Sequence, residues 1–157
     1  MSDQKTFYFA YGSNMSKPRL ERRIGTVHCH GRARLDDYCH RFSKRGRDGS
    51  AKGNVERAAG ARVWGVLYEL EPPQLEVLAG FETGYRAVDL SVTLDARSKL
   101  AVRAASFEAI AAVRGLEPTP EYLRHYLAGF HEHDLPASYR AALFADLDHI
   151  LSRLGQG

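Results

Sequence analysis

Residues 6–14 read TFYFAYGSN, and this stretch decides the fold at the N-terminal end of the chain. Its aromatic residues suit the pleated surface of a sheet, so a strand is predicted over residues 6–11. Gly12, Ser13 and Asn14 favour bent backbone and end that strand abruptly. Beyond the bend, Ser16 is a candidate N-cap for a short helix that ends at Gly25.

The middle of the chain has a strand-like pattern. The segments expected to be strands are 26–35, 38–43, 54–58, 63–70, 85–94 and 100–107. The first two are expected to pair with each other across Asp36-Asp37. Residues 44–53 read as a charged, Gly-rich loop with little packing, and Gly60 reads as a turn. The nearly continuous apolar run 63–70 predicts a strand buried on both faces.

Helical patterns dominate the C-terminal third. Pro72 and Pro73 first predict a helix that ends before Gly80. Thr119 is a candidate N-cap for a helix whose apolar residues recur every three or four positions, and a further helix is expected from Pro136 to Leu154. We therefore predict one α+β domain over residues 1–157. Its mixed or antiparallel curved β-barrel carries C-terminal helices, and its last few residues are disordered.

The bulk composition is that of an ordinary soluble protein. Of 157 residues, 44% are hydrophobic and 26% are charged, with a formal net charge of +3. The N-terminus lacks the apolar core of a signal peptide, and no apolar run has the length that a membrane span needs. Two cysteines make no disulfide framework. These observations predict a cytoplasmic location and no membrane partner.

A metal site and a nucleic-acid site are both weakly indicated. Strand alternation places His28 and His30 on the face opposite Cys29, so these residues and the pair Cys39-His40 do not converge. We therefore expect no metal, and two structural thiols within strands. The basic run 41–52 is typical of a solvated loop, so no nucleic-acid partner is expected. Binding of a nucleic acid or another partner through this run remains an alternative.

The bend after the first strand is also a candidate anion-binding site. Successive backbone N–H groups that point into one concavity form an anion-binding nest, and Gly12 would let a ligand approach the backbone closely. Such a nest suits a substrate carboxylate or a developing oxyanion. The alternative is an ordinary polar turn.

Glu82 is the most distinctive candidate for catalysis. It follows the apolar stretch 77–81 and precedes Thr83-Gly84. A carboxylate between Phe81 and Tyr85 would be partly desolvated, which would raise its pKa and suit proton transfer near neutral pH. The alternative is a solvated Glu at the end of a helix.

Four segments in order resemble the γ-glutamylcyclotransferase superfamily, which includes the AIG2-like proteins. They are YFAYGSNM (8–15), VWGVLY (63–68), LAGFETGY (78–85) and PTPEY (118–122). The similarity runs from Phe7 to about residue 139. The link Thr83-Gly84 is shorter than in some relatives. The basic stretch 44–53 lies where members of the family vary, and we expect it to face the group that leaves the substrate.

The resemblance implies an enzyme of transferase or lyase type. Its substrate would be a small γ-glutamyl amine or γ-glutamyl amino acid, converted to 5-oxoproline and a free amine by intramolecular acyl transfer. Glu82 falls at the family's catalytic position as general acid/base. The expected substrate-binding residues are Tyr11, Gly12, Ser13, Asn14, Met15, Tyr85 and Tyr122. No cofactor is expected and a homodimer is possible. The other candidate is a non-catalytic module that binds small molecules in the same pocket.

Overall fold

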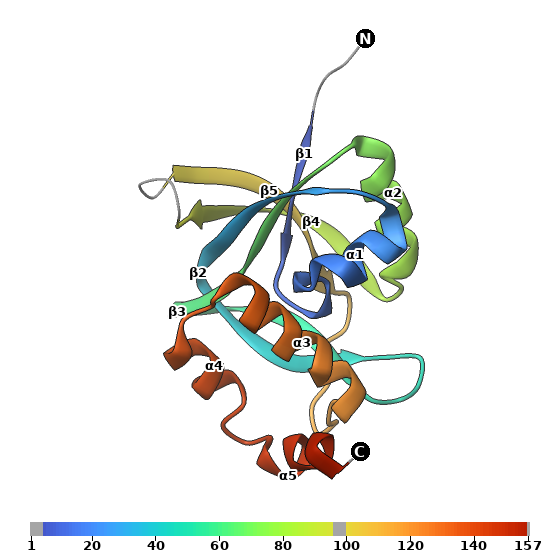
Figure 1. The fold of residues 1–157 in the computed structure, drawn as a ribbon, viewed down its shortest axis with the longest axis vertical. Coiled ribbons are helices and arrows are strands. Elements are labelled where there is room, and N and C mark those ends of the chain that lie inside the picture. The colour runs from blue at the N-terminus through green and yellow to red at the C-terminus, as the bar shows by residue number, and fades with distance from the viewer. Residues whose placement is uncertain (1–4, 96–99, 157) are drawn as a thin grey trace.

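The computed structural model describes residues 5–95 and 100–156, and its centre is a closed five-stranded barrel (Figure 1). The strands are β1 (Thr6–Ala10), β2 (His28–Arg45), β3 (Ala51–Leu70), β4 (Tyr85–Leu94) and β5 (Leu100–Ala109). Their order around the barrel is β1-β3-β2-β4-β5. The β1–β5 pair is parallel and the other pairs are antiparallel. The predicted single α+β domain with a mixed curved barrel is thus confirmed.

Strands β2 and β3 are longer than the sequence indicates, and the predicted pairing of 26–35 with 38–43 is wrong. Both segments belong to β2 and pair with β3, because Arg34 lies opposite Trp64 while Tyr38 lies opposite Arg57. The two strands bend together at Asp37 (φ 64°) and Gly60 (φ 80°). The amide of Gly60 donates a 3.0 Å hydrogen bond to Oδ1 of Asp37, so the bend is held without ending either strand.

The basic stretch 44–53 is also better ordered than predicted. Only its centre is a turn, in which the Gly46 amide donates to the Ser50 carbonyl at 2.9 Å. Lys44 and Lys52 lie opposite each other in the ladder between β2 and β3. Ala51 is fully buried, and its amide donates to the Glu117 carbonyl at 2.9 Å. The turn therefore connects two paired strands that reach the helical layer.

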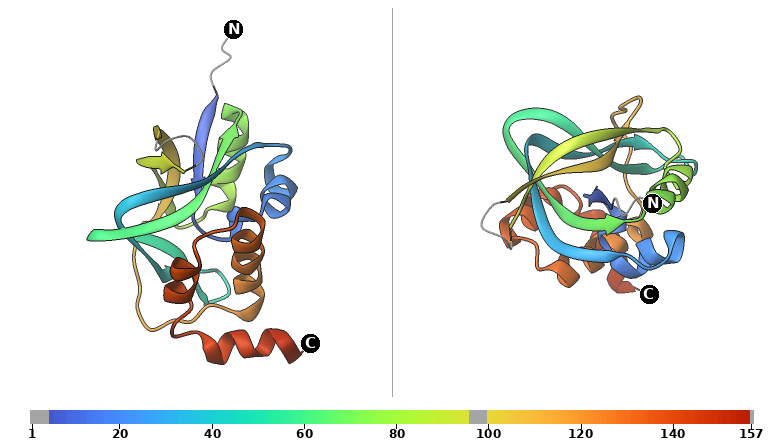
Figure 2. Two further views of the ribbon diagram at one scale, coloured as in Figure 1. Left: turned by 60° about the vertical axis from the view of Figure 1, so that its left-hand side comes forward. Right: turned by 90° about the horizontal axis from the view of Figure 1, so that it is seen from above.

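The helices gather on the side of the barrel and at one end of it (Figures 1 and 2). They are α1 (Lys17–Ile24), α2 (Pro72–Phe81), α3 (Pro120–His133), α4 (Ala137–Leu143) and α5 (Asp148–Leu151), with 3-10 turns at Ser13–Met15 (η1) and Ser152–Gln156 (η2). Helices α1 and α2 lie along the side, and α3–α5 cover one end. Within the described residues, none of these helices has both the length and the hydropathy of a membrane span.

The single helix predicted from Pro136 to Leu154 is wrong, because the chain leaves the helix after Leu143. Leu147 has φ −114° and ψ 10°, and the backbone re-enters a helix at Asp148. The break lets Leu147 and Ile150 join Leu123 of α3 in a small apolar cluster. Residues up to 156 form η2, whereas Gly157, part of the tail predicted to be disordered, lies outside the described residues.

Alternation along β1 divides its side chains between two cores. Tyr8 and Ala10 belong to the core between the barrel and the helices, and Phe9 belongs to the core inside the barrel, together with Tyr11 directly after the strand. Strand β3 is divided in the same way over residues 63–70, so the predicted burial of both its faces is confirmed. The end of β1 therefore lies where the barrel meets the helical layer.

Candidate active site

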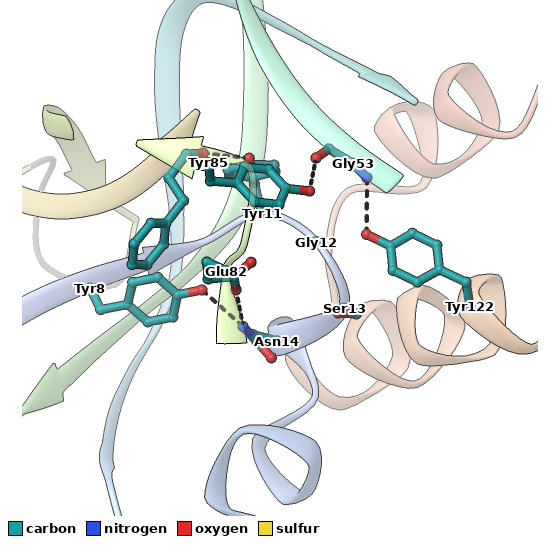
Figure 3. Close-up of a pocket in the computed structure, with 10 residues that line it drawn as sticks. Tyr8, Tyr11, Gly12, Ser13, Asn14, Gly53, Glu82, Tyr85 and Tyr122 are labelled. Carbon is teal, nitrogen blue, oxygen red and sulfur yellow. Dashed lines mark hydrogen bonds between the residues drawn. The ribbon is translucent and has the colours of Figure 1, made fainter. Parts of the chain in front are cut away.

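A small cavity opens at the end of β1, where the barrel and helices meet (Figure 3). Its wall combines β1 and the bend after it with the end of α2 and the start of β4. Strands β3 and β5 and helix α3 add one residue each. The lining residues are Tyr8, Tyr11, Gly12, Ser13, Asn14, Gly53, Glu82, Tyr85, Phe107 and Tyr122.

Glu82 stands at the C-terminal end of α2, with its backbone held on both sides. Its amide donates to the Ala79 carbonyl at 3.1 Å, and its own carbonyl accepts from the Tyr85 amide at 3.1 Å. The side chain projects towards the bend, where Oε1 accepts a 3.1 Å hydrogen bond from Nδ2 of Asn14. The same nitrogen donates to the Tyr8 hydroxyl at 3.2 Å. The carboxylate is therefore positioned by the bend as well as by its helix.

Burial raises the pKa of Glu82 above its ordinary value, because a charged carboxylate is poorly solvated in this cavity. Arg23, the hydrogen bond from Asn14, and then Lys44 and Arg19 oppose the shift without cancelling it. Of the two residues expected to desolvate Glu82, Phe81 is half exposed, whereas Tyr85 lines the cavity. Tyr8, Tyr11 and Tyr122 line it as well.

The bend leaves backbone donors beside this carboxylate. In η1 the Met15 amide donates to the Gly12 carbonyl at 3.0 Å. The amides of Gly12, Ser13 and Asn14 make no hydrogen bond to any residue that the structure describes. All three residues line the cavity, as expected of an anion-binding nest. Gly12 has little space around it, since a Cβ there would lie 3.2 Å from the Tyr126 hydroxyl.

The pocket tyrosines direct their hydroxyls mainly to the scaffold. The Tyr85 hydroxyl donates to the Gly53 carbonyl at 2.7 Å, and the Tyr122 hydroxyl accepts from the Gly53 amide at 2.9 Å. The Tyr11 hydroxyl donates to the Phe107 carbonyl. Gly53 thus holds both Tyr85 and Tyr122 in place. Because the Tyr122 hydroxyl accepts a hydrogen bond from Gly53, it can still donate its own proton to another acceptor.

The structure brings together every residue proposed from the sequence for this site except Met15. The Met15 side chain is fully buried in the core, and its carbonyl accepts from the Tyr68 hydroxyl at 2.7 Å. Three lining residues were not proposed: Tyr8, Gly53 and Phe107. Tyr8 lies inside the motif at 8–15, which could have indicated it. Gly53 and Phe107 carry no local signal, because strand pairing alone brings them here.

The histidines and cysteines near the barrel make pairwise contacts. His30 Nε2 lies 2.8 Å from Glu69 Oε1, and Cys29 Sγ lies 3.9 Å from His133 Nδ1. Among residues 5–95 and 100–156, no three His, Cys, Asp or Glu side chains are grouped as metal ligands. Both thiols are free and half-buried, and burial raises the pKa of Cys29, which makes it a weak nucleophile.

Comparison with known proteins gives one consistent result. Residues 8–117 match the family described as "Gamma-glutamyl cyclotransferase, AIG2-like". The chain is 27% identical to the γ-glutamylcyclotransferase of Bos taurus, over 87% of this chain and 76% of the bovine protein. It is 26% identical to the human protein of that name, over 91% and 80% of the two chains. A solved γ-glutamyl cyclotransferase has the same fold, with a TM-score of 0.81 and 23% identity, over 98% of this chain and 100% of that one.

Proposed function

This chain belongs to the γ-glutamyl cyclotransferase, AIG2-like family, and we propose that it converts a γ-glutamyl amine or γ-glutamyl amino acid to 5-oxoproline. The free amine is the second product. One observation carries the proposal: the partly buried Glu82 carboxylate is hydrogen-bonded by Asn14 in a cavity that is also lined by the bend, whose amides are unpaired among the described residues. A proton-transfer group and an anion-binding backbone therefore lie in one small site.

Glu82 acts on both nitrogens in the proposed reaction. The neutral α-amine attacks the γ-carbonyl carbon of the same molecule and forms the new C–N bond of the lactam. Glu82 accepts the proton that this nitrogen loses. It then donates that proton to the leaving nitrogen as the old amide C–N bond breaks, and returns to its carboxylate form. The proton that the attacking nitrogen loses is the one that the leaving nitrogen gains, so one carboxylate suffices.

The remaining contributions are positioning and electrostatic stabilisation. Ring closure is intramolecular, so a substrate held in the folded-back conformation has much of its barrier removed in advance. The amides of Gly12, Ser13 and Asn14 would bind the α-carboxylate or the oxyanion of the tetrahedral intermediate. Burial raises the pKa of Glu82 towards neutral pH. A carboxyl group whose pKa lies near the working pH can both accept and donate a proton efficiently.

The test is a panel of γ-glutamyl compounds incubated with the purified protein, with 5-oxoproline and free amine measured together. Equal amounts of both products are expected. Two controls should give neither: the α-glutamyl isomer, whose carbonyl is wrongly placed, and an N-acetylated γ-glutamyl compound, whose nitrogen cannot attack. Tight binding across the panel without any 5-oxoproline would contradict catalysis and support a non-catalytic binding module.

A further inference from the structure

A second cavity continues outward from the first. It is larger than the inner cavity and shares four lining residues with it: Ser13, Glu82, Tyr85 and Tyr122. In the proposed reaction, the γ-glutamyl group occupies the inner cavity and Glu82 reaches the leaving nitrogen. Whatever is attached to that nitrogen must therefore lie in this outer cavity.

The outer cavity is strongly cationic. Five of its lining residues are basic, namely Arg19, Arg23, Lys44, Arg47 and Lys52, against the two acids Asp48 and Glu82. The five come from α1, from both strands of the β2–β3 hairpin and from the turn between those strands. The basic residues therefore do not belong to one solvated loop, because separate elements place them around the same cavity.

Most of these cations are held by groups other than carboxylates. Arg47 Nη2 donates to Thr83 Oγ1 at 2.9 Å, and Lys44 Nζ lies 4.9 Å from the ring centre of Tyr85. The Arg23 guanidinium lies 5.0 Å from the ring centre of Phe81. Such contacts orient a cation without neutralising it.

Only one cation of the outer cavity has a carboxylate partner among the described residues. Lys52 Nζ lies 3.5 Å from Asp48 Oδ2, whereas the other four make no ion pair there. Hydrogen bonds from Ser50 lower the pKa of Asp48 to about 2, so this single acid stays ionised. The cavity keeps an excess of positive charge at neutral pH.

The neighbourhood of Arg19 indicates the same excess. Arg19 Nη1 lies 3.1 Å from His125 Nε2, and its buried Nε has no hydrogen-bond partner among the residues that the structure describes. The pKa of His125 is lowered to about 4, first by burial and then by Arg19, Arg22, Arg23 and Lys52. The imidazole of His125 is therefore neutral at neutral pH and does not compensate the positive charge of Arg19.

We propose that the leaving group of the substrate is itself polyanionic, with at least one negative charge beyond a single α-carboxylate. This inference rests on the proposed function, because it assigns the outer cavity to the leaving amine. Together with Asp48 and Glu82, one α-carboxylate would still leave two of the five positive charges uncompensated. An amino acid with an acidic or phosphorylated side chain supplies one or two further negative charges at small size.

The test compares substrates that differ only in charge. γ-Glutamylglutamate and γ-glutamylglutamine have nearly the same shape, and kcat/KM is expected to be about tenfold higher for the charged member. The advantage should shrink as salt is added, because partly exposed charges are screened. γ-Glutamylphosphoserine, measured against γ-glutamylserine, tests whether phosphate replaces the carboxylate. Equal kcat/KM within both pairs would overturn the inference and leave the proposed function intact.

Arg47 supplies the variant that links this preference to the outer cavity. Arg47→Gln keeps a polar side chain opposite Thr83 but removes the charge, so the ratio of kcat/KM within each pair should fall about threefold. The matched control is Arg103→Gln, an exposed residue of β5 that does not line either cavity, and its ratio should equal the wild-type ratio. A fall of the same size in both variants would contradict a local role for Arg47.

Direct titration separates failure of the inference from failure of the proposed function. If no compound yields 5-oxoproline, the proposed function fails, and calorimetry with the two dipeptides still tests the charge preference. Tighter binding of γ-glutamylglutamate would then support an anion-selective outer cavity, and equal affinities would refute it. Strong binding of a single-stranded oligonucleotide, with no discrimination between the dipeptides, would also overturn it.

Discussion

The side-chain amide of Asn14 donates a 3.1 Å hydrogen bond to the carboxylate of Glu82, which joins the bend after β1 to the end of α2. These residues are 68 positions apart in the sequence: Asn14 lies within η1, and Glu82 is the C-cap residue of α2. The contact gives the bend two tasks. It presents backbone amides to the cavity, and it holds the group that we propose to transfer the proton.

Asn14→Ala removes one of the interactions that lower the pKa of Glu82. The pKa of Glu82 should then rise further, so the carboxylate that acts as base forms only at higher pH. We expect the acidic limb of the kcat/KM profile to move to higher pH, and activity near neutral pH to fall about tenfold. Asn54→Ala is the matched control, because this buried Asn bonds Ser43 and Ala109 instead. It should cost stability and leave the profile in place, and a shift of equal size would contradict the role of Asn14.

Glu82→Gln should make the protein more stable at neutral pH. A raised pKa means that the folded state holds its proton more tightly than the unfolded state, so wild-type stability declines as pH rises from about 4.5 through the folded pKa. Glutamine carries no charge and avoids this loss, which amounts to about 1.4 kcal/mol for each unit of pKa shift. Denaturant unfolding of both proteins, at about pH 4 and about pH 7.5, measures the difference. A stability difference that does not change with pH would contradict a raised pKa.

Gly53→Ala should damage both the fold and the site. A Cβ at Gly53 would lie 2.1 Å from the Tyr126 hydroxyl, so β3 or that ring must move. We expect a loss of about 1–3 kcal/mol in the free energy of unfolding, together with lower turnover as Tyr85 and Tyr122 shift. The control is Gly80→Ala in α2, where a Cβ meets nothing within 4 Å. It should stabilise the protein by up to about 1 kcal/mol, and an equal loss in both variants would contradict the argument.

Gly12→Val tests the anion-binding role of the bend. Glutamate should raise the melting temperature of the wild type, because its α-carboxylate can bind the free amides. 4-Aminobutyrate has the same chain without that carboxylate and should raise it much less. The branched side chain at residue 12 would crowd Tyr126 and block the backbone, so the glutamate shift should disappear. An unchanged glutamate shift in Gly12→Val would place the carboxylate elsewhere.

The sequence predicts the parts of this molecule that depend on local chemistry. The aromatic strand, the bend at Gly12 and the helix that starts at Pro120 follow from residue type and spacing. The Thr119 side chain does accept from the Tyr122 amide, at 3.1 Å. The resemblance to the family then identifies Glu82 as the catalytic candidate, because its neighbours in the sequence are also compatible with a solvated Glu at the end of a helix. Local patterns therefore account for the barrel class and for one wall of the cavity.

The remaining features depend on contacts between distant residues. Gly60 is a turn residue by type, yet here it continues a strand because Asp37 on the paired strand accepts its amide. Gly53 becomes part of the cavity only because Tyr85 and Tyr122 converge on it. The basic residues near the β2–β3 turn read as a solvated loop until α1 brings Arg19 and Arg23 to the same space. Such features cannot be read from one segment.

The central claim is that the carboxylate of Glu82 transfers the proton. The most direct measurement is 5-oxoproline release by Glu82→Gln, with Glu76→Gln as control because Glu76 is exposed on the same helix. Circular dichroism and thermal unfolding first establish that both variants are folded. We predict that Glu82→Gln loses at least about 100-fold in kcat and that Glu76→Gln keeps wild-type activity. A folded Glu82→Gln protein with turnover close to the wild type would contradict the claim.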